Sequence, residues 1–238
     1  MKGKVLKITE KGIALSLFGF VASSPVSITA TQGFFLLGML LWIIKSIFSI
    51  QNPVSRIQKS AFKQMDGLKW SILLFFLAGI VASLTSLNPR ESFFDLRDFG
   101  FLFIIYFVAN HIRGEKRLKE LLHLLIAITT LTAIYGIGQA IMGMDRVKGP
   151  QAMTLTFAGI LIIVLSLTWS WLLFHAKGRE RWILLFEALI LSAALLLTYT
   201  RGAWLGLLMG LVILGMFSKP SFGFRLRLLV PAVILLYI

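Results

Sequence analysis

The sequence predicts an all-α protein, a polytopic transmembrane bundle of about nine helices. Of its 238 residues, 58% are hydrophobic and only 14% are charged, which is more apolar surface than a soluble domain of this size can bury. Apolar runs of ~18–24 residues recur along the chain, and this length matches the hydrocarbon core of a bilayer. No period-two alternation indicates a β-barrel. Residues 1–238 are therefore expected to form a single transmembrane domain.

The apolar runs define the expected helices. In chain order they are 12–30, 31–50, 70–87, 89–112, 118–142, 152–175, 182–200 and 202–217, with a ninth opening at 228. The N-terminal lysines before the first run are also the pattern of a signal peptide. Because apolar segments continue along the chain, a first membrane helix is favoured.

The basic residues are distributed asymmetrically between the loops. If the N-terminus is cytoplasmic, 19 of the 24 lysines and arginines fall in cytoplasmic segments. The outer side keeps Arg90, Arg97, Arg146, Lys148 and Arg201. This bias predicts the orientation by the positive-inside rule. The formal net charge of +14 is thus attributed to topology and to anionic membrane lipids, and no nucleic-acid partner is expected.

Residues 52–68 are expected to form an amphipathic helix on the cytoplasmic surface. Asn52 is a suitable cap, Pro53 suits the first helical position, and Gly67 suits the end. Basic side chains lie opposite an apolar stripe, which favours a helix lying on anionic headgroups. A solvated basic loop is the alternative.

The segment Thr198–Leu205 is a polar turn between two apolar runs, and it carries Arg201. An arginine at the rim of a hydrocarbon layer is costly unless an anionic or polar group receives it, so Arg201 is a candidate site residue. The alternative is an arginine that only anchors a helix end. Glycines 202, 206 and 210 follow at every fourth position, which predicts close approach of a neighbouring backbone.

The other outward basic residues extend this candidate site. Arg146 and Lys148 lie in the loop before the sixth helix, and Arg90 and Arg97 lie seven residues apart at the start of the fourth. A guanidinium offers a planar fork of donors for phosphate oxygens. Several cations at one membrane face therefore predict a binding site for a lipid headgroup or a diphosphate.

Other chemistries find little support in the sequence. There is no cysteine, so thiolate chemistry is excluded. Histidines 111, 123 and 175 are far apart in the sequence and lack metal-ligand spacing, so no metal site and no cofactor are expected. The first outer loop, Ser23–Gln32, has no acidic residue, which disfavours a metal-dependent glycosyltransferase with a carboxylate there. Glu187 is expected to pair with Arg181 or with a neighbouring helix, and a proton-relay role is a further alternative.

The segment Leu196–Gly206 resembles the signature of the O-antigen ligase and O-antigen polymerase superfamily. In that family a Ser/Thr-rich helix end precedes an arginine and, four positions on, a leucine, as in Arg201 and Leu205. Residues 146–149 are similar to the Arg-x-x-Gly loop of the same family. The sequence departs after that loop, where Pro150–Met153 replaces an Asn-Pro-Asn-like run.

The resemblance implies a function in lipopolysaccharide biosynthesis at the periplasmic face of a bacterial inner membrane. It implies an inverting, metal-independent glycosyl transfer from undecaprenyl diphosphate to lipid A–core in a ligase, or to a lipid-linked glycan in a polymerase. Arg201 is then the catalytic residue that engages the donor diphosphate, and Arg146 or Lys148 is expected to help hold it. A transporter or flippase of lipid-linked glycans is a rival from another class.

The family also has a large outer loop with a histidine that acts as general base, and nothing in this sequence matches it. Leu228–Ile238 supplies 11 residues, about 16 Å of helix, which is half a bilayer crossing. The chain is therefore expected to be the N-terminal part of a longer fold. We expect this piece alone to be inactive.

Overall fold

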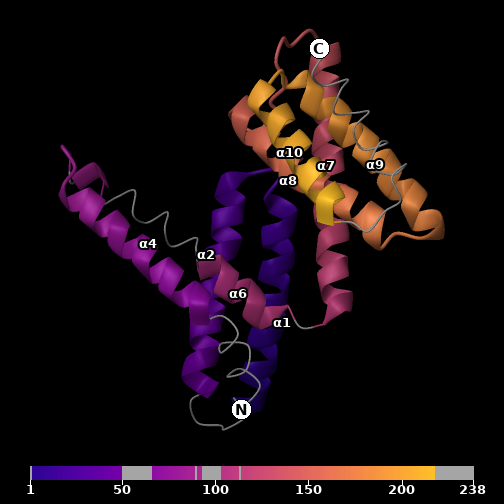
Figure 1. Cartoon of the computed structure of the whole chain (residues 1–238). Coiled ribbons are helices and arrows are strands. Elements are labelled where there is room, and N and C mark those ends of the chain that lie inside the picture. Colours follow the sequence, from indigo (N-terminus) through magenta and orange to yellow (C-terminus); the bar gives the residue numbers. More distant parts are fainter. Residues whose placement is uncertain (1, 50–65, 89, 93–102, 113, 218–238) are drawn as a thin grey trace. The chain divides into compact units, whose positions relative to one another are not determined.

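A computed structural model describes residues 2–49, 66–88, 90–92, 103–112 and 114–217 (Figure 1). Within these residues all regular structure is helical, so the predicted all-α class is confirmed for this part of the chain. The helices are α1 (Lys2–Ser23), α2 (Ile28–Ser49), α4 (Asp66–Leu84), α6 (Phe103–His111), α7 (Glu115–Ile141), α8 (Thr154–Phe174), α9 (Gly178–Leu197) and α10 (Arg201–Phe217).

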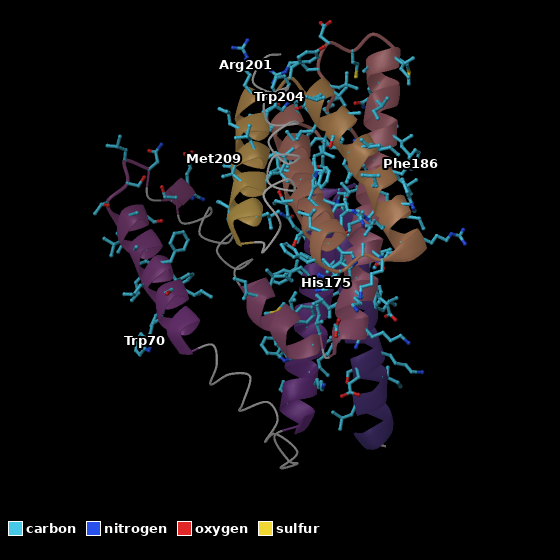
Figure 2. All side chains as sticks on the ribbon, turned by 45° about the vertical axis from the view of Figure 1, so that its right-hand side comes forward. Trp70, His175, Phe186, Arg201, Trp204 and Met209 are labelled. Atoms are coloured by element: carbon cyan, nitrogen blue, oxygen red, sulfur yellow. The ribbon has the colours of Figure 1, made fainter. Side chains whose placement is uncertain are left out.

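Among the described residues, three helices are long and apolar enough to cross a membrane: α2 over Ile28–Lys45, α7 and α8. Shorter apolar segments, Trp70–Leu84 and Arg201–Gly215, lie in α4 and α10. Many large apolar side chains face outward, among them Phe186 and Met209 (Figure 2), which are 66% and 63% exposed. Outward apolar side chains are tolerated where lipid rather than water surrounds a helix. The structure thus agrees with a helical membrane protein, and the nine-helix bundle stays a prediction.

The first two helices differ from the predicted ranges. Helix α1 begins at Lys2 rather than at residue 12, because Lys, Leu and Glu are good helix formers even where they lower hydropathy. It ends at Ser23 rather than at residue 30. The chain turns over residues 24–27, and α2 begins at Ile28 rather than at 31. The predicted outer loop Ser23–Gln32 is therefore much shorter.

Several predicted features lie partly or wholly outside the described residues. The predicted ninth helix from residue 228 lies wholly outside them, and the predicted helix 52–68 lies mostly outside them. Gly67, which was expected to end that helix, lies instead in the first turn of α4. Of the predicted helix 89–112, residues 90–92 and α6 are helical. The later helices α7–α10 begin and end within about four residues of the predicted ranges.

The described residues divide into two compact units. Unit 1 contains those of Met1–Phe20 and Gln32–Lys119. In it α1 and α2 run side by side (Figure 1), so closely that a Cβ at Gly19 would lie 2.5 Å from the ring of Phe34. Lys45 of α2 forms an ion pair with Glu10 of α1 at 3.0 Å. These contacts set the register of the two helices.

Unit 2 contains the described residues of Val21–Thr31 and Glu120–Ile238. Its helices α7, α8, α9 and α10 pack beside one another (Figure 1) and share one hydrophobic core. Helix α8 lies at the centre of this core, since Phe157, Leu161 and Leu165 are all fully buried. The α7–α8 loop and the α9–α10 turn lie at the same end of unit 2, since the backbone N–H of Val147 donates to the Leu197 carbonyl at 3.2 Å.

The glycine series of α10 does not serve close backbone packing within the described residues, so that prediction is wrong there. A Cβ at Gly202 would meet nothing within 4 Å. At Gly206 and Gly210 the nearest atoms are side-chain tips of α8, Ile162 Cδ1 at 3.9 Å and Ser166 Oγ at 3.5 Å. Ordinary side chains on α8 keep the two backbones apart.

Candidate functional site

The turn between α9 and α10 is held by a dense set of hydrogen bonds. Thr198, which is fully buried, donates from Oγ1 to the carbonyl of Leu195 at 2.7 Å. The same Oγ1 accepts from the backbone N–H of Thr200 at 3.3 Å. The indole Nε1 of Trp204 also donates to the Leu195 carbonyl, at 3.2 Å. The last turn of α9 and the first turn of α10 are thereby tied together.

The loop between α7 and α8 is organised by Gln139, a buried side chain on the last turns of α7. Its Oε1 accepts from the backbone N–H groups of Lys148 at 3.2 Å and of Gly149 at 2.9 Å. Its Nε2 donates to the Gly149 carbonyl at 2.9 Å. All three bonds fold the loop back onto the helix that precedes it.

The side chains of this loop alternate between inside and outside. Val147 is fully buried, and Gly149 adopts a left-handed conformation with φ of 60°. A Cβ at Gly149 would lie 2.6 Å from the ring of Phe157, so only glycine fits. Arg146, just before Val147, and Lys148, between Val147 and Gly149, are exposed. The two cations are thus presented on the outer surface of the loop.

The loop and the turn are joined directly. The backbone N–H of Val147 donates to the Leu197 carbonyl at 3.2 Å, and Nε of Arg146 donates to the Thr198 carbonyl at 3.3 Å. Gln151 adds a third segment, because its Nε2 donates to the carbonyl of Pro25 at 2.8 Å. Three connections that are far apart in the sequence therefore meet at one end of unit 2.

Arg201 is the first residue of α10 and lies at this same end. It is exposed, and Figure 2 shows it pointing away from the helices, above Trp204 on the same helix. Within the described part of the chain, no carboxylate pairs with Arg201. A helix N-terminus carries a partial positive charge, which adds to that of the guanidinium. The position suits an anionic ligand.

The arrangement therefore gathers three of the five predicted site residues. Arg146, Lys148 and Arg201 lie on two segments that hydrogen bond to each other. Arg90 is exposed and belongs to unit 1, and Arg97 lies outside the described residues. Their part in binding stays a prediction, as does that of the other three.

Figure 2 shows His175 far from Arg201, at the opposite end of unit 2. There His123 and His175 both contact the Trp171 ring, with centroid distances of 5.7 and 4.9 Å. Glu180 accepts from Trp171 Nε1 at 2.8 Å and lies 3.1 Å from His123 Nε2. His123 and His175 are far apart in the sequence, and the antiparallel course of α7 and α8 brings them to the same tryptophan. Among the described residues no group of three or more His, Asp or Glu is arranged to hold a metal ion.

Sequence reasoning missed the residues that hold the site in shape. Gln139 and Gln151 carry its main side-chain hydrogen bonds, but a single glutamine in an apolar context belongs to no motif. Gln139 offers one signal, because an amide within an apolar helix is costly unless it is paired; Gln151 lies before α8, outside any helix, and offers none. Thr198 was visible only as part of a Ser/Thr-rich helix end.

Known proteins give no further guidance. Comparison with family models, with curated proteins and with solved structures finds no match.

Proposed function

We propose that this protein is a membrane glycosyltransferase that takes its glycan from a polyprenyl diphosphate, with the diphosphate held by Arg201, Arg146 and Lys148. The observation that carries the proposal is the direct connection of the two basic segments through Val147–Leu197 and Arg146–Thr198. Separate anchoring arginines would not need such a connection. A site for a doubly charged group needs cations from more than one segment, held at fixed positions.

The proposed chemistry is an inverting transfer without a metal. The acceptor hydroxyl attacks the anomeric carbon, and the bond from that carbon to the diphosphate oxygen breaks with its electron pair going to the leaving group. Charge builds on the diphosphate, and a fixed guanidinium at Arg201 stabilises it in the transition state. The acceptor proton passes to a base, a role that the resemblance gives to a histidine of an outer loop.

The position of Arg146 supports a distinct part for each cation. Its Nε is used in the bond to Thr198, which orients the guanidinium and leaves the two terminal nitrogens for a ligand. Arg201 has no such tether among the described residues and can close onto the diphosphate as it binds. In the proposed site, Arg146 is held in place and Arg201 is free to adjust to the ligand.

The acceptor decides between the two activities of the resembled family, and we propose lipid A–core, as in a ligase. The proposed protein is a multi-pass bundle of the bacterial inner membrane, with a cytoplasmic N-terminus and the Arg201 end in the periplasm. A polymerase and a flippase are the remaining candidates. No observation on the described residues favours either of them.

The test is the Arg201→Lys variant in cells that depend on this protein for surface polysaccharide. A bidentate contact to phosphate does not survive the change to lysine, so we expect glycan transfer to fall on the order of 10²–10³-fold. Arg181→Lys is the matched control, because Arg181 is an exposed arginine on α9 near the opposite end of unit 2. It should transfer glycan at the wild-type rate.

The products separate the three candidates. Loss of a ligase leaves full-length lipid-linked glycan in the periplasmic leaflet. Loss of a polymerase leaves single repeats attached to lipid A–core, and loss of a flippase leaves lipid-linked glycan in the cytoplasmic leaflet. Wild-type transfer by Arg201→Lys would contradict the proposed role of Arg201.

A further inference from the structure

Tyr199 has a backbone conformation that its side chain disfavours. Its φ is 49°, and it is the one non-glycine residue with positive φ in the described part of the chain. It directly follows Thr198, the C-terminal cap of α9. Glycine or asparagine is usual at such a position, because a Cβ in the left-handed region crowds the following carbonyl. A tyrosine here costs free energy.

Nothing within the described structure compensates for that cost through the side chain. Tyr199 is 58% exposed, and within the described residues its ring and hydroxyl have no hydrogen-bond or ring partner. The backbone around it, in contrast, is held firmly. The N–H of Tyr199 donates to the Leu196 carbonyl at 3.0 Å, and Thr200 Oγ1 donates to the Thr198 carbonyl at 3.3 Å.

A strained residue that its neighbours hold in place is a feature of ligand sites. Tyr199 precedes Arg201 by two residues, so their backbones are at most about 7 Å apart. Both residues therefore lie at the turn to which Arg146 is bonded, and both are exposed there. A ligand phosphate at Arg201 would place its adjoining group within reach of the tyrosine.

We propose that Tyr199 contacts the sugar that is bonded directly to the donor diphosphate; this rests on the proposed function. A tyrosine offers a flat apolar face and a hydroxyl at its rim. A pyranose ring presents the matching chemistry, an apolar C–H face bordered by hydroxyl groups. A polyprenyl chain has no group for the tyrosine hydroxyl. The tyrosine thus orients the anomeric carbon, while Arg201 holds the leaving group.

The test measures equilibrium binding of two probes to the purified chain in detergent. One probe is undecaprenyl diphosphate, and the other is the same lipid carrying a single N-acetylglucosamine. We expect Tyr199→Gly to bind the sugar-bearing probe about five- to tenfold more weakly, as loss of one aromatic contact would give. Its binding of the sugar-free probe should change less than about twofold. Tyr199→Phe keeps the ring and loses the hydroxyl, so it should weaken binding of the sugar-bearing probe by less than Tyr199→Gly does and leave binding of the sugar-free probe unchanged.

The effect of a lost contact is separable from misfolding, because glycine adopts the left-handed conformation freely. The thermal midpoint of Tyr199→Gly should therefore not fall, and Tyr199→Asn serves as a second variant that tolerates this conformation. If Tyr199→Gly loses affinity equally for both probes, the proposal is overturned in favour of a lipid or phosphate contact. If it loses affinity for neither probe, the proposal is overturned and Tyr199 is an interfacial anchor.

The same titration separates this inference from the proposed function. Arg201→Lys should lower the affinity for both probes alike, because both carry the diphosphate. If the wild-type protein binds both probes, and Arg201→Lys lowers the affinity while Tyr199→Gly does not, the sugar contact is wrong and the diphosphate site stands. If wild-type protein binds neither probe, the proposed function fails and the sugar contact fails with it.

Discussion

Replacing Gln139 by leucine should release the α7–α8 loop without unfolding unit 2. The substitution keeps the size of the side chain but removes three hydrogen bonds, two from the N–H groups of Lys148 and Gly149 and one to the Gly149 carbonyl. A protein hydrogen bond contributes about 1 kcal/mol net, and an unpaired buried group costs about 1–3 kcal/mol. The free energy of opening the loop should therefore fall by about 2–4 kcal/mol.

The assay is amide hydrogen exchange of the loop, followed by mass spectrometry in detergent or nanodiscs. Each ~1.4 kcal/mol is a factor of ten, so exchange across residues 144–151 should become at least about 30-fold faster. The Thr130→Val variant is the control. Thr130 is a buried residue of the same helix, and its hydroxyl donates to the carbonyl of Ile126 at 2.9 Å, within α7 and away from the loop, so the loop should exchange as in the wild type.

A second variant tests which atoms matter. Gln139→Glu keeps an acceptor for the two N–H groups and loses the donor to Gly149, so its loop exchange should fall between those of wild type and leucine. Unchanged exchange in Gln139→Leu would refute the reasoning that this side chain holds the loop. The positions given to Arg146 and Lys148 would then lack support.

Two further substitutions test the geometry of the site. Gly149→Ala should lower the thermal midpoint, because its Cβ would lie 2.6 Å from the ring of Phe157 and its φ is positive; overpacking costs about 1–3 kcal/mol, and an unchanged midpoint would contradict this. Gly159→Ala is its control, since a Cβ there meets nothing within 4 Å and alanine favours a helix. Thr198→Val should cost about 1–2 kcal/mol, roughly 2–8 °C in midpoint, by removing the hydroxyl bonds to Leu195 and Thr200. Wild-type stability of the valine variant would show that the turn does not need them.

The helices of unit 2 were predictable because their apolar runs are long and are interrupted by polar turns. The start of α1 was not, because the lysines that begin it lower hydropathy without lowering helix propensity. Hydropathy locates membrane-spanning segments, whereas a helix can extend beyond the span into water.

The proposed site was predictable only as a set of residue types. Arg146, Lys148 and Arg201 stood out because basic residues are rare on the expected outer side. Their connection was not visible, since it depends on a backbone N–H of Val147 and on the Thr198 carbonyl, and every residue has such groups. The left-handed conformation of Tyr199 was equally hidden, because neither glycine nor asparagine marks it.

The most direct test of the central claim is binding of undecaprenyl diphosphate to the purified protein in the presence of a metal chelator. We predict saturable binding that the chelator does not change and that Arg201→Lys weakens at least about tenfold, because a point charge replaces a bidentate donor. Arg181→Lys should bind as the wild type does. Equal affinity of wild type and Arg201→Lys, or binding that disappears with the chelator, would contradict a metal-independent diphosphate site at Arg201.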